Sequence, residues 1–343
     1  MKGCRRNVDT GKPFSAPIKT KGEGRMKSVV SVIMQEDGEQ AVREALEHHG
    51  GMEAIVPRGA TVMIKPNFTG ALPPETGAAS DPKIAKELAR LALRAGASKV
   101  VIAEGIGGGL VSLKDVSGLR EISEMKGVEV VDLNDEQTEA VAVSDPLSVE
   151  RFDIPRVVLD CDFLINLAKL KVHPQAMLSL AMKNLMGALP GRSFKNPEEA
   201  RRQGYLTPII PGGGKKIFHD LARDRGIETM QDAIVDLNTV IPSHLTVVDG
   251  IYGMEGKGAP VRGKSVKMSL LILGTDTVAV EAVGAAAMGF DPDSIPYLEH
   301  GVEKGVGFEY RVKDLDIQGA KLDEVRRTFE PANAAFLWNE VSE

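Results

Sequence analysis

The stretch "DFLINLAKLKVHPQAMLSLAMKNLMG" (162–187) predicts a strand that leads through a turn into a helix. Its first half, 162–170, is a short apolar run of the kind found in buried strands. A proline, Pro174, follows, and the segment 175–189 then has the composition of a helix with a glycine near its end. A strand followed by a helix is the repeating unit of α/β proteins with parallel sheets.

The same unit recurs on both sides of this stretch. Asp81 and Pro82 have the residue types of an N-cap and a first helical position, so a helix is expected over 81–97. We expect an α/β fold with a mostly parallel sheet flanked by helices, Rossmann-like in its layers, and leave one body or two lobes open. The expected strands are 28–34, 60–68, 98–105, 127–135, 162–170, 244–249 and 266–274, and the further helices are 38–51, 175–189, 217–241 in two pieces, and 295–307.

Segment composition predicts the domain organisation. Residues 26–330 form the expected α/β domain, and 331–343 a C-terminal tail. Residues 1–25 hold seven Lys or Arg against two Asp or Glu, so we expect a disordered basic extension or an over-assigned start. Residues 187–216 are rich in glycine, proline and charge, which favours a lid or a disordered insertion about equally.

Composition excludes several functions. A net charge of −6 and 4% aromatic residues argue against a nucleic-acid surface. The two cysteines, Cys4 and Cys161, cannot supply an iron–sulfur cluster from this chain, and Cys161 is expected to be a small core residue. No apolar run reaches the ~18 residues that a membrane span needs, so we expect a soluble, cytoplasmic protein.

Polar and charged side chains gather where the predicted strands end. In open α/β sheets, ligands bind beyond the carboxyl ends of the strands. We therefore expect a site there. It would be formed by Lys65, Asn67, Lys169, Lys171, His173, Lys183, Asn184, Asp249 and Glu255.

Four lysines in this set predict an anion site. Lys169, Lys171 and His173 alternate with apolar residues, so a continuous strand would point them to one face. Clustered lysines repel one another and lose protons unless an anion lies between them. The alternatives are a phosphate or carboxylate ligand, a neutral lysine that acts as a base, or lysines that extend singly to solvent.

Roles for these residues follow from their chemistry. We expect His173, Lys171 and Asp249 to be catalytic, and the substrate to be bound by Lys65, Asn67, Lys169, Lys183 and Asn184. Asp249 and Glu255 could together bind Mg²⁺ or Mn²⁺, although two carboxylates leave open whether any metal binds.

These residues lie in motifs that resemble the DUF362 family, a group of bacterial and archaeal proteins without an assigned function. The resemblance rests on "VMIKPNF" (62–68), "CDFLINLAKLKVHPQAMLSLAMKNLMG" (161–187), "VVDGIYGMEGKGAPVRG" (247–263) and "LLILGTDTVAVEAVGAAAMGFDP" (270–292). Relatives often have D-P-V-A-x-D where this chain has Asp276 to Glu281, so the last carboxylate has a longer arm. Many relatives also carry a ferredoxin-like segment with [4Fe–4S] clusters, which implies a ferredoxin-like partner here.

Three functions remain open at this point. The leading expectation is an enzyme that acts on an anionic small molecule, with its reaction unassigned. The second is an accessory redox protein that docks an iron–sulfur partner, and the third is a non-catalytic binding protein. The residues do not settle whether the chain forms a homo-oligomer.

Overall fold

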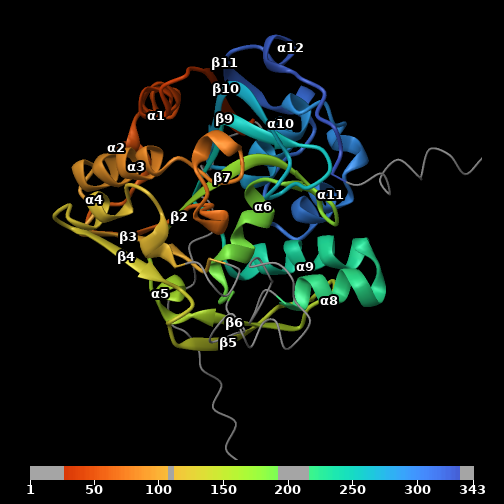
Figure 1. Cartoon of the computed structure of the whole chain (residues 1–343), viewed down its shortest axis with the longest axis horizontal. Helices are drawn as coiled ribbons and strands as arrows, with labels where there is room; N and C mark the ends of the chain where they lie inside the picture. Colours follow the sequence, from red (N-terminus) through yellow and green to blue (C-terminus); the bar gives the residue numbers. More distant parts are fainter. Residues whose placement is uncertain (1–26, 107–111, 192–215, 333–343) are drawn as a thin grey trace, which may run out of the picture.

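A mixed sheet forms the centre of the computed structural model, which describes residues 27–106, 112–191 and 216–332 (Figure 1). The sheet has nine strands, eight of them in the order β11-β1-β10-β9-β7-β2-β3-β4, with the short β8 paired to β7. Neighbours from β9 to β4 are all parallel, whereas β10 is antiparallel to both β9 and β1. The strands are β1 (Val29–Met34), β2 (Thr61–Lys65), β3 (Lys99–Glu104), β4 (Val128–Asp132), β7 (Phe163–His173), β8 (Met177–Ser179), β9 (Leu245–Glu255), β10 (Lys264–Gly274) and β11 (Asp316–Gly319). The fold is therefore α/β with a mostly parallel sheet, as expected.

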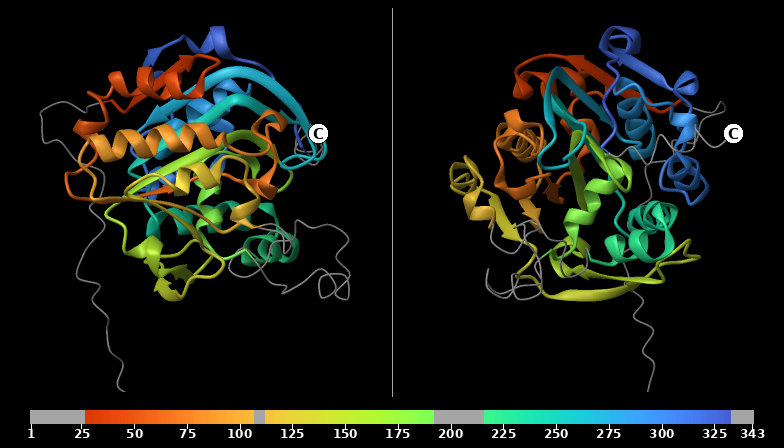
Figure 2. Two further views of the ribbon diagram at one scale, coloured as in Figure 1. Left: turned by 60° about the vertical axis from the view of Figure 1, so that its left-hand side comes forward. Right: turned by 45° about the vertical axis from the view of Figure 1, so that its right-hand side comes forward.

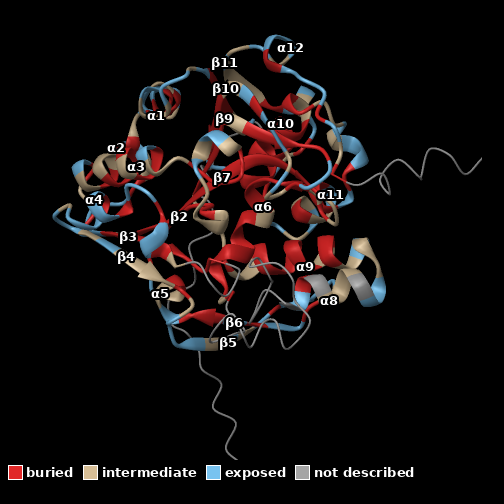
Figure 3. Ribbon diagram, viewed as in Figure 1, coloured by how far each residue is buried: buried red, intermediate tan, exposed pale blue. Residues whose placement is uncertain are grey.

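Helices cover both faces of this sheet (Figure 2). Successive strand residues such as Leu164 and Ile165 belong to two different apolar clusters, because side chains alternate between the faces of a strand. One face is covered by α1 (Gly38–Glu47), α2 (Met52–Ile55), α3 (Pro82–Arg94) and α4 (Leu119–Ser123). The other is covered by α6 (Ala181–Asn184), α9 (Ile227–Val240), α10 (Thr277–Ala287) and α11 (Pro296–Glu303). The buried residues accordingly lie along the strands and the inner helix faces (Figure 3).

Smaller elements complete the described chain. A separate hairpin is formed by β5 (Thr138–Ala142) and β6 (Arg151–Pro155). The remaining helices are α5 (Arg156–Leu159), α8 (Lys216–Arg225) and α12 (Leu322–Val325), with short 3₁₀ turns η1 (Thr69–Ala71), η2 (Pro74–Thr76), η3 (Leu113–Asp115), η4 (Leu185–Ala188), η6 (Pro292–Ser294) and η7 (Val312–Asp314). None of the helices described is long and apolar enough to cross a membrane.

The order of the parallel strands creates a switch point between β2 and β7. From β2 the chain proceeds outward to β3 and β4, and it then returns to the other side of β2 to form β7 and β9. Helices α3 and α4 therefore lie on one face of the sheet and α9 on the other. The carboxyl ends of β2 and β7 separate here, which is the usual place for a ligand in an open α/β sheet.

Most of the predicted elements are present. Helix α3 begins at Pro82 with the Asp81 side chain as its N-cap, and the predicted break at Gly226 separates α8 from α9. Cys161 is buried in the core, as expected, and burial raises the pKa of its thiol to about 12.

Two predicted elements were wrong. The segment 175–189 is not one helix: β8 folds back on β7, with Lys171 opposite Ser179, and only Ala181–Asn184 is α-helical before η4. The strand expected over 244–249 is longer than expected, because β9 continues to Glu255 and pairs with β10. In both places backbone pairing with a neighbouring strand decides the conformation, and local composition does not show it.

Several predictions lie outside the described residues. They concern the basic extension 1–25, most of the insertion 187–216, Cys4 and most of the tail 331–343.

Candidate functional site

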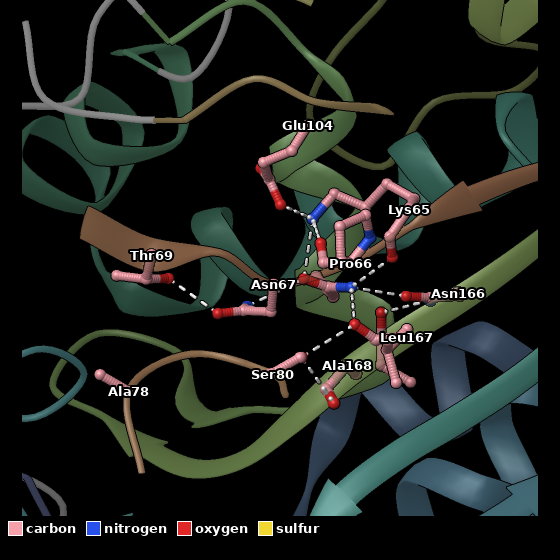
Figure 4. Close-up of polar contacts among 12 residues, drawn as sticks. Lys65, Pro66, Asn67, Thr69, Ala78, Ser80, Glu104, Asn166, Leu167 and Ala168 are labelled. Carbon is pink, nitrogen blue, oxygen red and sulfur yellow. Dashed lines mark hydrogen bonds and ion pairs between the residues drawn. The ribbon is translucent and has the colours of Figure 1, made fainter. Parts of the chain in front are cut away.

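A polar network fills the space between the ends of β2 and β7 (Figure 4). These strands pair only as far as Lys65 and Asn166, after which residues 66–81 turn away while β7 continues to His173. Backbone carbonyls of β7 therefore lose their strand partner. The Ser80 hydroxyl donates to two of them, those of Leu167 at 3.3 Å and Ala168 at 3.4 Å.

Asn184 on α6 is the centre of this network. Its Oδ1 accepts hydrogen bonds from Lys65 Nζ at 2.8 Å and Asn67 Nδ2 at 2.9 Å. Its Nδ2 donates to Asn166 Oδ1 at 2.7 Å and to the Leu167 carbonyl at 3.2 Å. One buried amide thus ties the end of β2 to β7.

Lys65 forms a buried ion pair. Its Nζ lies 2.8 Å from Glu104 Oε2 at the end of β3 and donates to the Pro66 carbonyl at 2.6 Å. A Cβ at Gly187 would lie 2.2 Å from this Nζ and 2.3 Å from Glu104 Oε1. The backbone of η4 therefore packs directly on the pair, and Lys65 has a carboxylate partner.

Lys169 also has a carboxylate partner. Its Nζ lies 2.9 Å from Asp249 Oδ2, and both side chains are fully buried. The register places Asp249 on β9 directly beside Lys169 on β7. The carboxylate also accepts the backbone N–H groups of Asp81 at 2.8 Å and Ile251 at 3.1 Å. Such a pair, with its oxygens hydrogen-bonded, is stable in the interior of a protein.

Lys171 has a different environment. Its Nζ donates to the Ala78 carbonyl at 2.6 Å, to Asn67 Oδ1 at 2.9 Å and to Thr69 Oγ1 at 3.2 Å. All three acceptors are uncharged, and within the described ranges no carboxylate forms an ion pair with this ammonium. The side chain is only 1% exposed. Its three N–H donors are satisfied, but its charge is not compensated.

Electrostatics oppose the charged form of Lys171. Burial holds the pKa of its ammonium well below the ordinary value of 10.5, and neighbouring lysine charges lower that pKa further. Glu104, already paired with Lys65, opposes the shift. The lysines that act on it are Lys183, Lys169 and Lys65, in that order of effect.

A short turn covers Lys171. Thr69, which contacts the ammonium, begins η1 and is half-buried. Gly70 and Ala71 in this turn have φ angles of +63° and +50°. The second value is unfavourable for a residue with a Cβ. Ala71 also borders a cavity of about 450 Å³ between η1, η2 and the start of α3, which Ser80 lines as well.

His173 and Lys183 lie at the borders of the network. His173 is buried, and its Nδ1 accepts the backbone N–H groups of Gln175 and Ala176, both at 3.1 Å. This ring nitrogen therefore stabilises the turn between β7 and β8. Lys183 is half-buried on α6, beside Asn184, and its charge acts on Lys171.

Asp249 and Glu255 do not form a metal site together. They lie six residues apart on β9, which is about 20 Å along an extended strand. Glu255 accepts the backbone N–H of Glu330 at 3.1 Å and lies 3.4 Å from Lys264 Nζ. In the part of the chain that the structure describes, no three His, Cys, Asp or Glu side chains come together as metal ligands.

Sequence reasoning did not assign roles to several members of the network. Glu104 ends a strand, which was a usable signal, and Asn166 is a lone amide in an apolar strand. The hydroxyl of Ser80 and the carbonyl of Ala78 gave no signal, because backbone and short polar groups acquire partners only from the fold.

Comparisons with known proteins agree with this organisation. The model of a family described as "Domain of unknown function (DUF362)" matches residues 62–286. The thylakoid-associated protein sll1697 of Synechocystis sp. is 23% identical over 256 residues, which cover 75% of this chain and 71% of that protein.

Two solved structures are also similar. The lactate racemase apoprotein from Thermoanaerobacterium thermosaccharolyticum has a TM-score of 0.42 at 15% identity, and the match covers 76% of this chain and 57% of that one. A protein from Thermotoga maritima has a TM-score of 0.38 at 14% identity, with 78% and 58% covered. The chain thus spans less than three fifths of either structure.

Proposed function

The chain belongs to the DUF362 family, which has no assigned function, and we propose from its residues that it is an enzyme binding a small anionic molecule beside Lys171. The anion is a carboxylate or a phosphate. The observation that supports this most strongly is the contrast between Lys171 and its neighbours: Lys65 and Lys169 each have a buried carboxylate, whereas Lys171 has only uncharged oxygens.

The charge of Lys171 is what an anion would neutralise. The charge of Lys183 acts on Lys171 and lowers its pKa. A carboxylate or phosphate beside Lys171 opposes that effect and raises the pKa of Lys171 toward its ordinary range. Anion binding and proton uptake by Lys171 are therefore coupled in this proposal.

Lys171 is also the best candidate for acid–base chemistry. A lysine with a lowered pKa loses its proton more readily than an ordinary lysine, and its neutral amine can accept a proton from a bound substrate. The proton moves to Nζ and its electron pair stays on the substrate. His173 is the weaker candidate because its Nδ1 already accepts two backbone N–H groups. We assign Asn67 to orienting Lys171 through its Oδ1.

A substrate would reach Lys171 past the turn η1. Thr69 contacts the ammonium and is half-buried, so displacement of this turn would open a route from solvent to Lys171. The positive φ of Ala71 supports this, since a strained backbone persists only where the surrounding structure maintains it. The adjoining cavity would then receive the uncharged part of the substrate.

Thermal unfolding in the presence of anions tests the proposal. The wild type would be compared with Lys171→Met, using inorganic phosphate, pyrophosphate, acetate, malonate and citrate. Binding to the native state alone adds about 2.7 kcal/mol at a ligand concentration of 100 times Kd, which raises Tm. We expect a stabilised wild type and a variant without the shift. The exposed Lys267, paired with Glu36, provides the control variant Lys267→Met, which should respond like the wild type.

The other two functions are distinguished by further outcomes. Equal stabilisation of the wild type and Lys171→Met would place anion binding elsewhere and contradict the proposal. No stabilisation by any anion, together with iron in the purified protein, would favour an accessory protein that recruits a cluster from a partner. Binding that depends on Lys171 but is accompanied by no reaction of any bound compound would favour a non-catalytic binding protein.

A further inference from the structure

Glu281 is a fully buried carboxylate outside the network around Lys171. It lies on α10, with 0% of its surface exposed. Its Oε2 accepts the backbone N–H of Met182 at 2.9 Å, and its Oε1 accepts the Tyr297 hydroxyl at 2.8 Å. Among the described residues, no Lys, Arg or His side chain donates a hydrogen bond to this carboxylate.

The contact with Met182 matters because α6 has little support of its own. This helix has four residues, and its N-cap, Leu180, provides no side-chain hydrogen bond. The first N–H groups of a helix have no partner within the helix and need one from outside. Glu281 supplies it from α10. The Met182 carbonyl, in turn, accepts Asn238 Nδ2 from α9 at 2.9 Å.

The position of α6 decides where Asn184 lies. Asn184 is two residues beyond Met182, and its amide joins Lys65, Asn67 and Asn166 in the switch-point network. A shift of the first turn of α6 would therefore move a side chain that bridges β2 and β7.

We propose that Glu281 is a pH-sensitive positioning residue, whose ionised carboxylate holds the first turn of α6 and thereby places Asn184 in the network. When the carboxyl is protonated, one of its oxygens becomes a hydroxyl donor. Either Met182 N–H or Tyr297 O–H then loses its best acceptor. The network would be well ordered above the midpoint of this titration and looser below it.

The surroundings of Glu281 bring this titration near neutral pH. Burial raises the pKa of Glu281 to about 7, although the backbone N–H groups of Ala181 and Met182 favour the ionised form. The titratable and charged groups that act on it are Tyr297 from α11 and Lys183 from α6. The pKa of Tyr297 is raised well above 10, so its hydroxyl stays protonated and remains a donor.

Nuclear magnetic resonance of selectively labelled protein tests this inference. In ¹⁵N-methionine protein, the Met182 amide reports directly on its acceptor, and Met182→Leu identifies the signal. We expect its chemical shift to titrate with a midpoint near 7 in the wild type and to stay flat in Glu281→Gln. The exposed Glu303 on α11 gives the control Glu303→Gln, which should keep the titration. A flat wild-type signal, or a titration that survives in Glu281→Gln, would overturn the inference.

A second label reports on the network. In ¹⁵N-asparagine protein, the Nδ2 signals of Asn184, identified with Asn184→Leu, should titrate with the same midpoint and lose that dependence in Glu281→Gln. Titration of Met182 without any change at Asn184 would show that Glu281 ionises but does not position the site. Neither measurement needs a ligand, so these outcomes are independent of the proposed anion-binding function.

Discussion

Lys169 and Lys171 lie two residues apart on the same strand, and both are buried, with 0% and 1% of their surfaces exposed. Lys169 contacts the carboxylate of Asp249, whereas Lys171 contacts only uncharged oxygens. Burial alone therefore does not distinguish a structural lysine from a functional one. The partner distinguishes the two lysines here: Lys169 joins two strands through its carboxylate partner, and Lys171, which has no carboxylate partner, is the lysine that we propose binds a ligand.

The two lysines lie on either side of an irregularity between β7 and β9. Lys169 is opposite Asp249, but Lys171 is opposite Met254, so the register shifts by several residues between them. The glycines at 250 and 253 permit this, because a Cβ at either would lie 2.9 Å from a carbonyl oxygen, that of Leu270 or Leu170. Regular pairing would have placed Ile251 opposite Lys171, so the register alone does not explain why Lys171 lacks a carboxylate partner.

The largest expected effect tests whether Lys169 has a structural role. Lys169→Met leaves Asp249 as a buried, uncompensated carboxylate, which should lower the free energy of unfolding by about 3–5 kcal/mol. Urea denaturation at pH 7 measures this. The double variant Lys169→Met/Asp249→Leu should recover much of the loss, since it removes both charges. A loss below about 1 kcal/mol in the single variant would place this pair among weak surface-like pairs.

Glu281 is the acidic counterpart of Lys171, since its hydrogen-bond partners are uncharged as well. Its pKa is raised from 4.5 to about 7, so the native state binds the proton more tightly than the unfolded state does. The contribution of Glu281 to the free energy of unfolding is therefore largest below pH 4.5 and is lost as pH rises to about 7. The loss is about 3 kcal/mol at 1.36 kcal/mol per pKa unit.

The Glu281→Gln variant checks this linkage. Urea midpoints of both proteins between pH 5 and 8 should show a decline in the wild type that is weaker in the variant. Parallel curves would mean that Glu281 does not titrate in this range.

The Lys65–Glu104 pair gives a third case, in which a lysine is held by a carboxylate and by packing. Gly187→Ala would place a methyl group within contact distance of both charged groups. Overpacking of this kind lowers stability by about 1–3 kcal/mol. Thermal unfolding of Gly187→Ala beside the wild type measures the loss. A Gly187→Ala variant as stable as the wild type would show that η4 moves to accommodate the methyl group.

Lys171→Met should change stability least, by about 1 kcal/mol or less at pH 7. The substitution leaves the Ala78 carbonyl without its donor, which lowers the free energy of unfolding by about 1–3 kcal/mol. It also removes a buried charge that its surroundings disfavour, and this gain in stability offsets much of the loss. A loss of stability as large as that of Lys169→Met would show that both lysines have a structural role.

The free energy of unfolding of the wild type and of Lys171→Met should depend differently on pH. Because the native pKa of Lys171 is lowered, the unfolded state binds its proton more tightly, and wild-type stability falls as pH drops below 10.5 toward the native pKa. Lys171→Met should lack this slope between pH 7 and 10, as measured by urea denaturation.

Much of the fold follows from local sequence. Apolar runs and amphipathic segments predicted the helix α3, whose start Asp81 and Pro82 marked correctly, and seven strands, namely β1, β2, β3, β4, β7, β9 and β10, but not β5, β6, β8 or β11. The errors at 175–180 and 250–255 occurred where a second strand supplies the hydrogen bonds. Backbone pairing between distant segments depends on neighbours that no local window contains.

The sequence by itself determined which residue types meet at the switch point, because the ends of β2 and β7 carry Lys65 and Lys171 in any parallel arrangement of these strands. Only the tertiary structure decided which lysine is paired. Glu104 and Asp249 come from other strands, and each of them pairs with a different lysine, Lys65 or Lys169. Charge compensation acts over a few ångströms in space, so its outcome is set by packing and register rather than by order along the chain.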